Sequence, residues 1–308
     1  MVLSEEEIAA LEKSGYRVVG RHKHSAVEIC RWTRKSILDQ GVCYKQKFYH
    51  EIHGIESHRC LQMTPSLPFC DHKCVFCWRN TDLTYPRWKG PCDDPAEILD
   101  GAVSAQRLLL SGFKGNPNAN LEKWQEAQDP TLCAISLAGE PTIYPKIGEL
   151  IAECKRRGMV SFLVTNGQHP EVLGEIEEPA QLYISVVAPD EETYRRVCRP
   201  QIPRGWERLN ESLELMPSFS CVRVLRLTLV RGLNLRDPAG YARLVEKAKP
   251  DFVEPKGYMW VGYSRRRLGI DNMLSHGEIK EFASELARET GYDVVDESEP
   301  SRVILMRG

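Results

Sequence analysis

The sequence of 308 residues lacks the features that would direct a chain into a membrane or out of the cell. No apolar run approaches the roughly 20 residues that a membrane-spanning helix needs. The amino-terminal "MVLSEEEIAALEKSG" has the pattern of an acidic amphipathic helix, which neither a signal peptide nor a transit peptide has. An excess of one charge is also missing, since the net charge is −2. Eleven cysteines, an odd number, without a secretion signal favour a reducing compartment, and we expect the cytoplasm.

A fourth cysteine is missing from the stretch "FCDHKCVFCWRN" (69–80), which holds Cys70, Cys74 and Cys77. A structural zinc site usually has four ligands, and this stretch adds only His72 with no second cysteine pair nearby. Thiolates suit zinc or iron–sulfur clusters. A [4Fe–4S] cluster held by three cysteines leaves one iron open to a substrate. A zinc site and unligated core cysteines are the alternatives.

The pattern after Cys60 predicts an α/β fold, because short β-branched runs alternate with amphipathic segments. We expect strands at 59–66, 132–138, 160–166, 182–188, 224–230 and 251–258. Capping signals mark the helices between and after them: Pro95 at a first turn, Gly158 at an end, and Ser275 as a cap with Glu278 three residues later. Six strand–helix units in series imply a parallel sheet. Since a full barrel has eight, we predict a partial, open (β/α)6 TIM-like barrel whose chemistry lies where the strands end.

The predicted organisation has two parts. Residues 1–58 form an extension before the first strand, and residues 59–308 form the barrel with a carboxy-terminal helix and strand. The stretch 112–130 is predicted to be an insertion or a lid-like loop. Cysteines outside the motifs are assigned to core packing: Cys92, Cys133, Cys154, Cys198 and Cys221.

Three further cysteines, Cys30, Cys43 and Cys60, precede the motif, and Lys45 follows Cys43 by two residues. Buried thiols are one interpretation, because cysteine packs as a small hydrophobe. The surrounding stretch is basic and polar, however, and three thiols again suit a cluster with one open iron. The histidines of the same stretch are rival ligands: His22, His24, His50, His53 and His58.

Basic residues gather in three places despite the balanced total. Residues 21–60 hold eight Lys and Arg against four Asp and Glu, residues 195–208 hold five Arg, and residues 265–267 are three Arg. Any one of these runs is explained by solvated surface. The three together favour a phosphate-rich partner.

The Cys-x3-Cys-x2-Cys spacing after a first strand resembles the radical S-adenosylmethionine superfamily. The resemblance implies that the open iron chelates S-adenosylmethionine and that one electron cleaves it to a 5′-deoxyadenosyl radical. Phe76 matches the aromatic position that packs against adenine. Gly139 and Glu140 of "SLAGEPTIYP" match the pair that binds the ammonium group through charge-assisted hydrogen bonds. Asn166 and Ser185, at the ends of the next two strands, are candidates for ribose contacts.

The complete set of motifs resembles one family, the tRNA 4-demethylwyosine synthases. It comprises the three upstream cysteines, Cys43-x-Lys45, "CDHKCVFCWRN", "SLAGEPTIYP", "LVTNG" and "KGYMWVGYSRRRL". The match runs from about Cys30 to the carboxy-terminal helix. It implies a carbon–carbon lyase that condenses pyruvate with N1-methylguanosine at position 37 of tRNA(Phe) to form 4-demethylwyosine (imG-14). The adenosyl radical would take hydrogen from the N1-methyl group, and the carbon radical would add to pyruvate.

The same resemblance assigns the remaining residues. Cys30, Cys43 and Cys60 would hold a second [4Fe–4S] cluster that chelates pyruvate, and Lys45 could instead form a Schiff base with its keto carbon. A phosphate contact or an exposed charge is the other interpretation of Lys45. Bases of an anticodon loop can be splayed out and stacked, and the aromatic candidates for this are Trp78, Tyr258, Trp260 and Tyr263. The basic runs would follow the RNA backbone.

Too few residues precede Cys30 for the flavodoxin-like domain of eukaryotic relatives, so we expect the stand-alone archaeal type, a monomer with an external electron donor of the ferredoxin or flavodoxin type. Two alternative functions stay open. One is a radical S-adenosylmethionine enzyme that acts on another RNA or on a protein. The other is a non-catalytic iron–sulfur or zinc protein that binds RNA.

Overall fold

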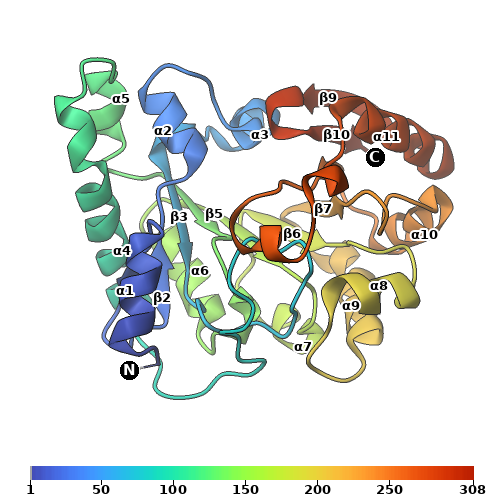
Figure 1. Ribbon diagram of the computed structural model, residues 1–308, viewed down its shortest axis with the longest axis horizontal. Helices are drawn as coiled ribbons and strands as arrows, with labels where there is room; N and C mark the ends of the chain where they lie inside the picture. Colours follow the sequence, from blue (N-terminus) through green and yellow to red (C-terminus); the bar gives the residue numbers. More distant parts are fainter. Residues whose placement is uncertain (1) are drawn as a thin grey trace. The chain divides into compact units, whose positions relative to one another are not determined.

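The computed structural model describes residues 2–308 (Figure 1). The chain divides into two compact units. The first unit comprises Met1–Phe69, Arg87–Val164 and Ile176–Ala180. The second comprises Cys70–Pro86, Thr165–Glu175 and Gln181–Gly308. In the part of the chain that the structure describes, no helix combines the length and the apolar character needed to cross a membrane.

The strands of the first unit form a mixed sheet in the order β1-β2-β3-β4-β5. They are β1 (Arg17–Val19), β2 (Ser25–Val27), β3 (Cys60–Thr64), β4 (Leu132–Ile135) and β5 (Val160–Thr165), whose last residue belongs to the second unit. Strands β1 and β2 form an antiparallel pair, β2 is antiparallel to β3, and β3, β4 and β5 are parallel. The parallel strands place Cys60 opposite Leu132, and Leu132 opposite Val160.

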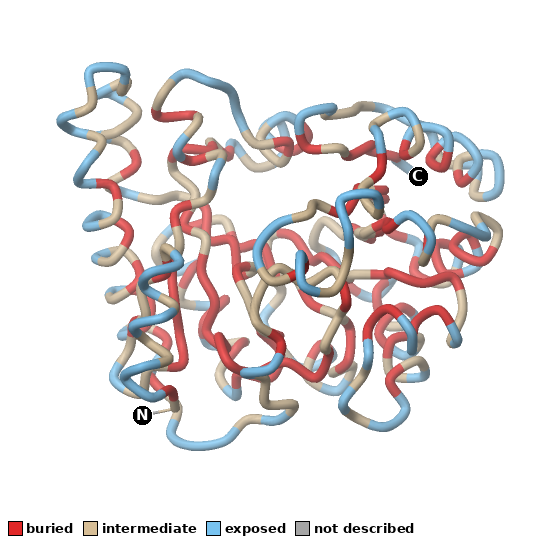
Figure 2. Tube along the Cα trace, in the orientation of Figure 1, coloured by how far each residue is buried: buried red, intermediate tan, exposed pale blue. Residues whose placement is uncertain are grey.

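In its described residues, the first unit contains six α-helices, of which α4 makes the most extensive contacts with this sheet. They are α1 (Glu5–Lys13), α2 (Arg31–Ile37), α3 (Tyr44–His53), α4 (Pro95–Leu110), α5 (Leu121–Glu126) and α6 (Ile147–Arg156). Helix α4 begins after Asp94, whose side chain accepts a hydrogen bond from Ala96 N, and Pro95 occupies its first position as predicted. Its buried face, which includes Ile98 and Leu99, packs on β1, β2, β3 and α6 (Figure 2).

The second unit repeats the strand–helix alternation and ends in an antiparallel edge. Its strands are β6 (Gln181–Ser185), β7 (Val222–Leu229), β8 (Phe252–Gly257), β9 (Asp293–Ser298) and β10 (Val303–Arg307). Strands β6, β7 and β8 are parallel, β10 is antiparallel to β8, and β9 is antiparallel to β10. The helices are α7 (Pro170–Leu173), α8 (Glu191–Cys198), α9 (Gly205–Leu215), α10 (Pro238–Ala248) and α11 (His276–Thr290).

The six predicted strands are confirmed as β3 to β8, and their parallel direction is confirmed within each unit. The capping box of Ser275 and Glu278 is confirmed at the start of α11, and α6 ends just before Gly158. The β1–β2 hairpin was not predicted, because strands of three residues are too short to show an alternating pattern. A domain boundary between residues 58 and 59 stays a prediction.

The prediction of a lid-like loop at 112–130 is wrong. The segment contains a 3₁₀ turn (Ser111–Gly115) and α5, which begins after Asn120 with the asparagine side chain accepting from Lys123 N. Trp124 and Phe113 pack against a small buried cluster that includes Ile37. The sequence does not predict this packing, because the polar run "GNPNAN" separates the apolar residues too widely for them to form the pattern of one helix.

Candidate active site

The three-cysteine motif lies in the second unit, on a loop held largely by backbone hydrogen bonds. Cys70 N donates to Tyr85 O (2.9 Å), and Cys77 N donates to Cys74 O (3.1 Å), which closes the turn between the last two cysteines. Lys73 N and Val75 N donate to carbonyl oxygens at the end of α8, at 3.0 and 2.9 Å. Cys70 is buried, and Cys74 and Cys77 are half-buried. The loop therefore presents three thiols, none of them in a disulfide, on a backbone held by hydrogen bonds.

Arg79 places a half-buried positive charge beside these thiols. Its guanidinium donates to His72 O (3.3 Å) and to Thr84 Oγ1 (3.1 Å). Burial disfavours its charged form, but the charges of the three cysteines outweigh burial and raise the pKa of Arg79. Thiolates are the forms of cysteine that ligate metals, and a fixed cation lowers the cost of gathering three of them. The donor set and its counter-charge fit an iron–sulfur cluster.

Cys198 is a residue whose position the sequence did not indicate. It is buried at the end of α8, as core packing requires, but its sulfur also lies next to the motif. The ligand atoms of His72, Cys74 and Cys198 are all within 4.8 Å of one another. The hydrogen bond between Cys74 and Cys198, together with burial, raises the pKa of the Cys74 thiol well above its ordinary value.

Asn166 lies in contact with the motif. Its Nδ2 donates to Asp71 Oδ1 (2.5 Å), and His169 Nε2 is 2.9 Å from Asp71 Oδ2. Asp71 is fully buried; burial raises its pKa, but the hydrogen bonds from His169 and Asn166 outweigh this and hold the pKa of Asp71 below its usual value. The end of β5 and the cysteine loop thus meet through Asp71. A ribose contact of Asn166 stays a prediction.

Two other predicted residues of this unit are accessible. Phe76 is half-buried between Cys74 and Cys77, and Ser185 is half-buried at the last position of β6, opposite Arg226 of β7. Arg226 in turn donates to the buried carboxylate of Glu254 at 3.0 and 2.9 Å. The sequence did not indicate this ion pair.

Gly139 and Glu140 lie in the first unit, packed on the residues that precede Cys70. Gly139 has φ +74°, and a Cβ there would be 2.0 Å from Ser66 O and 2.7 Å from Phe69 O. Glu140 N donates to Phe69 O (2.7 Å). The Glu140 side chain is 2% exposed, and its Oε1 accepts from Thr142 N (3.0 Å) and Thr142 Oγ1 (2.6 Å). The glycine is required by this close approach of two backbone segments, and the carboxylate is held in one orientation.

The upstream cysteines come together in one pocket of the first unit. Cys30, Cys43, Cys60 and Lys45 all line it. None of the five neighbouring histidines is among the residues that line it in the described structure. His24, for example, bonds to Pro65 O (2.7 Å), and His58 to Glu126 Oε2 (2.8 Å).

Electrostatics in this pocket favour a bound cation. Burial raises the pKa of Cys30, while backbone N–H groups of α2 and the Lys45 ammonium oppose the rise. Burial raises the pKa of Cys60 as well, and the charges of Cys30 and Cys43 add to it. Burial and mutual repulsion therefore disfavour three thiolates in this pocket, and metal binding offsets both effects while releasing the protons. The site therefore fits a metal cluster in its donor set and its electrostatics.

Ser57 braces the pocket. Its Oγ accepts from Cys43 N (2.7 Å) and donates to Gln46 Oε1 (2.7 Å), and its carbonyl oxygen accepts from Thr33 Oγ1 (2.9 Å). It therefore joins α2, the start of α3 and the approach to Cys60. Ser57 carries no sequence motif, so only the three-dimensional arrangement identifies it.

Lys45 occupies the first turn of α3 and is half-buried. Its Nζ lies 5.1 Å from the centre of the Phe162 ring, and its charge acts on both Cys30 and Cys60. An apolar ring on one side and thiols on the other place this amine inside the pocket. An exposed, solvated lysine is excluded.

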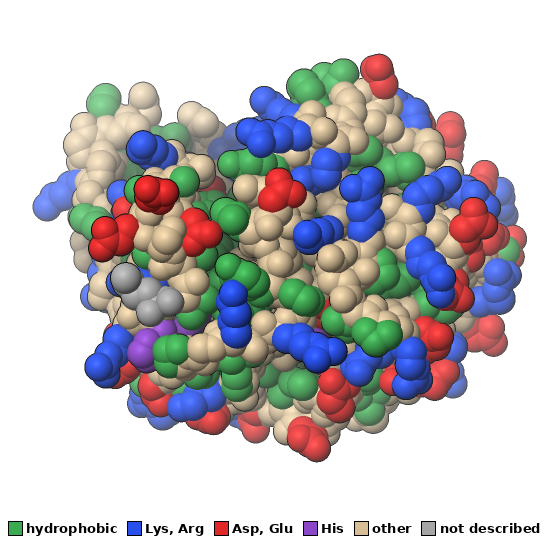
Figure 3. Space-filling model, turned by 60° about the horizontal axis from the view of Figure 1, so that its bottom comes forward, with side chains coloured by type: hydrophobic (Ala, Val, Ile, Leu, Met, Phe, Trp, Pro, Cys, Tyr) green, Lys and Arg blue, Asp and Glu red, His purple; other side chains and the backbone are tan. Residues whose placement is uncertain are grey.

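The arginines of the basic runs differ in their contacts and in their exposure. In the run 195–208, four of the arginines have acceptors: Arg195 with Glu191, Arg196 with Leu233 O, Arg204 with Glu211 and Arg208 with Glu171. On the face drawn in Figure 3, Lys and Arg are interspersed with Asp and Glu. Arg265 and Arg266 are exposed and lie over the rings of Trp260 and Tyr263, both at 4.6 Å. Tyr258 is buried at 2% exposure, so its ring is not available for stacking.

Comparisons with known proteins were made over the whole chain. The model of the radical SAM superfamily matches residues 64–245, and the model for wyosine base formation matches residues 247–307. S-adenosyl-L-methionine-dependent tRNA 4-demethylwyosine synthase of Pyrococcus horikoshii is 51% identical over 98% of this chain and 88% of its own length. The enzyme of the same name from Methanocaldococcus jannaschii is 37% identical over 99% of this chain and 97% of its own length. The relative from Saccharomyces cerevisiae is 38% identical, and the match covers 37% of its length.

Two solved structures are also similar over nearly the whole chain. A structure of TYW1 with a lysine–pyruvate adduct bound has a TM-score of 0.88 and 36% identity, covering 100% of this chain and 97% of that one. The crystal structure of archaeal TYW1 has a TM-score of 0.80 and 33% identity, with coverages of 99% and 96%. The chain therefore has the radical SAM fold, a partial TIM-like barrel, and the predicted fold class is confirmed.

Proposed function

Because the chain belongs to the family of S-adenosyl-L-methionine-dependent tRNA 4-demethylwyosine synthases, we propose that it condenses pyruvate with N1-methylguanosine at position 37 of tRNA(Phe). The product would be 4-demethylwyosine (imG-14), which places the enzyme among the carbon–carbon lyases. That it is a radical SAM enzyme of wyosine formation follows from the family. The pyruvate, the position of the base and the identity of the tRNA are the proposed parts.

Cys70, Cys74 and Cys77 would hold the [4Fe–4S] cluster that the radical SAM family uses. When bound, this cluster supplies the electron that cleaves S-adenosylmethionine. The chain's own contribution is to bind and orient that molecule. Glu140 offers a fixed carboxylate to the ammonium group, and Phe76 offers a ring to the adenine. Asn166 and Ser185 are the proposed ribose contacts.

The observation that carries the proposal is the presence of Lys45 in the same pocket as Cys30, Cys43 and Cys60. We assign a second [4Fe–4S] cluster to these three thiols. The Lys45 amine, in its neutral form, would attack the keto carbon of pyruvate; water leaves, and a neutral Schiff base remains. The related structure that contains a lysine–pyruvate adduct supports this role.

The proposed RNA contacts are the exposed Arg265 and Arg266 with the rings beneath them, because cations track phosphates and aromatic rings stack on unpaired bases. Radical SAM chemistry needs a reductant, and we propose a donor of the ferredoxin or flavodoxin type. A monomeric state and a cytoplasmic location stay predictions.

The test is an anaerobic incubation of reconstituted protein with reductant, S-adenosylmethionine, pyruvate and tRNA(Phe) that carries N1-methylguanosine at position 37. Mass spectrometry of the digested nucleosides should show the tricyclic base, and it should be absent when pyruvate is omitted. The same yield without pyruvate would refute the assignment.

Lys45 is tested separately by reductive trapping. Borohydride added in the presence of pyruvate should fix one reduced pyruvate on Lys45, located by peptide mass spectrometry. Lys45→Arg should abolish both trapping and product. Lys47→Arg, which alters an exposed lysine on the same helix, should leave both intact. Trapping that persists in Lys45→Arg would assign the Schiff base elsewhere.

A further inference from the structure

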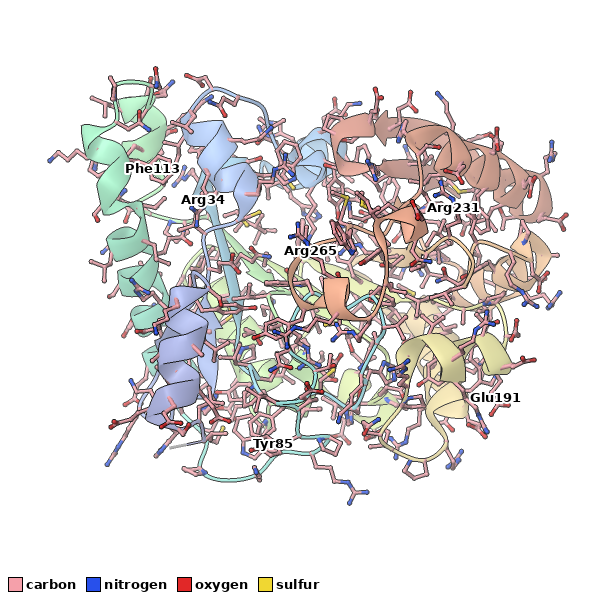
Figure 4. The ribbon with its side chains drawn as sticks, in the orientation of Figure 1. Arg34, Tyr85, Phe113, Glu191, Arg231 and Arg265 are labelled. Carbon is pink, nitrogen blue, oxygen red and sulfur yellow. The ribbon has the colours of Figure 1, made fainter. Side chains whose placement is uncertain are left out.

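The segment 258–268 follows β8 and folds directly onto the three-cysteine loop. Tyr263 N donates to Trp78 O (2.8 Å). Gly262 has φ +57°, and a Cβ at this position would be 2.3 Å from Trp78 O. Only a glycine permits so close an approach. Both partners belong to the second unit, and Figure 4 labels Arg265 on this segment.

The three consecutive arginines of this segment are used differently. Arg265 and Arg266 are exposed and lie on aromatic rings. Arg267 turns into the cysteine loop. Its Nε donates to Val75 O (3.1 Å), its Nη1 to Thr81 Oγ1 (3.2 Å), and its Nη2 to Cys77 O.

These contacts fix the backbone on both sides of the turn that carries the last two cysteines. The carbonyl groups of Val75 and Cys77 flank Phe76, so holding both sets the directions in which the side chains of Cys74, Phe76 and Cys77 leave the chain. A guanidinium can bond to two carbonyls and a hydroxyl at once, because its donors are arranged in a rigid planar fork. The ammonium group of lysine lacks that geometry.

We propose that Arg267 is a positioning residue that sets the geometry of the cysteine loop and thereby the binding of S-adenosylmethionine. Arg267 lies in the part of the chain matched by the wyosine-formation model, whereas the loop lies in the part matched by the radical SAM model. The contact thus makes the family-specific segment a structural component of the general cofactor site. The inference rests on the proposed ligands Cys70, Cys74 and Cys77, and it is independent of the identity of the RNA substrate.

The test compares Arg267→Met and Arg267→Lys with a control, Arg236→Met, which alters an exposed arginine outside this segment. Each protein is reconstituted anaerobically, and four quantities are measured without tRNA or pyruvate. They are iron per chain, the electron paramagnetic resonance spectrum of the reduced cluster with and without S-adenosylmethionine, the KM for S-adenosylmethionine, and the rate of 5′-deoxyadenosine formation.

We expect both Arg267 variants to bind iron as the control does, to show an altered spectrum only after S-adenosylmethionine is added, and to have a KM raised about tenfold, since charged hydrogen bonds are lost. A control-like spectrum and KM in Arg267→Met overturn the proposal. If Arg267→Met does not fold, the test uses Arg267→Lys. A spectrum and a KM for S-adenosylmethionine in Arg267→Lys that equal those of the control would then overturn the proposal. Failure of wyosine formation would leave these readouts unchanged, so the two proposals fail separately.

Discussion

At the scale of single residues, Gly139 lies beside Glu140, the residue predicted to bind the ammonium group. Gly158 serves as a control position for testing why a glycine is needed there. Their φ values are similar, +74° and +69°, but a Cβ at Gly158 would meet no atom within 4 Å. At Gly139 it would collide with the carbonyl oxygens of Ser66 and Phe69. The two positions therefore share the backbone strain of a left-handed residue and differ only in steric clash.

We expect Gly158→Ala to lower the free energy of unfolding by about 1–2 kcal/mol, the cost of a non-glycine residue in this conformation. Gly139→Ala should cost about 4 kcal/mol or more, because two backbone segments must separate. Urea unfolding measures both, and isothermal titration of S-adenosylmethionine should show weaker binding only in Gly139→Ala. Equal losses of stability in the two variants would contradict the close approach.

A site residue could be predicted from the sequence only where the residues that act with it are close to it in the chain. Cys70, Cys74, Cys77 and the pair Cys43 and Lys45 could be proposed because their spacing is local. The basic run 265–267 predicts an RNA contact for Arg267, whereas its contacts with Val75 and Cys77 are formed between segments far apart in the chain. The closeness of Cys198 to Cys74 could not be predicted for the same reason.

At the scale of elements, the pocket of Cys30, Cys43 and Cys60 depends on Ser57, which connects two helices and the approach to β3. Ser57→Ala leaves Cys43 N and Gln46 Oε1 without this partner. We expect the free energy of unfolding to fall by about 2 kcal/mol and the iron bound at this pocket to decrease. Ser14→Ala, which removes an exposed hydroxyl bond to Ala10 O, should change neither quantity. Full iron content in Ser57→Ala would show that the brace is dispensable.

The start of α11 should make the second unit sensitive to acid. Hydrogen bonds from Arg231 and from Ser275 lower the pKa of Glu278 to about 2 from its ordinary 4.5. Since the folded value lies below the unfolded one, this contribution to stability is complete above about pH 4.5 and is lost as the pH falls towards 2. The difference in Tm between wild type and Glu278→Gln should therefore be clear at pH 7 and small near pH 2. Glu285→Gln, an exposed position of the same helix, should show no such pH-dependent difference.

Elements were predictable where one strong pattern covers the whole element. The buried strands β4 and β6 are nearly continuous apolar runs, and α11 has a complete capping box. Helix α5 has six residues and depends on packing near Ile37 and Leu110, and β1 and β2 depend on pairing with each other and with β3. Short elements of this kind are specified by tertiary contacts, which local patterns do not show.

At the scale of the whole molecule, the two proposed cysteine sets belong to different units, with Cys30, Cys43 and Cys60 in the first and Cys70, Cys74 and Cys77 in the second. Each set is braced by hydrogen bonds within its own unit, through Ser57 in one and through Arg267 in the other. Loss of one site should therefore leave the other able to bind iron.

Iron content tests this independence. We expect about eight irons per reconstituted chain for two [4Fe–4S] clusters, about four in Cys43→Ala, and about eight in the control Cys92→Ala. Cys43→Ala should still cleave S-adenosylmethionine to 5′-deoxyadenosine, since Cys70, Cys74 and Cys77 are intact, but it should form no tricyclic base. About four irons in the wild type with no loss in Cys43→Ala would remove the second site. Loss of 5′-deoxyadenosine formation in Cys43→Ala would show instead that the two sites are coupled.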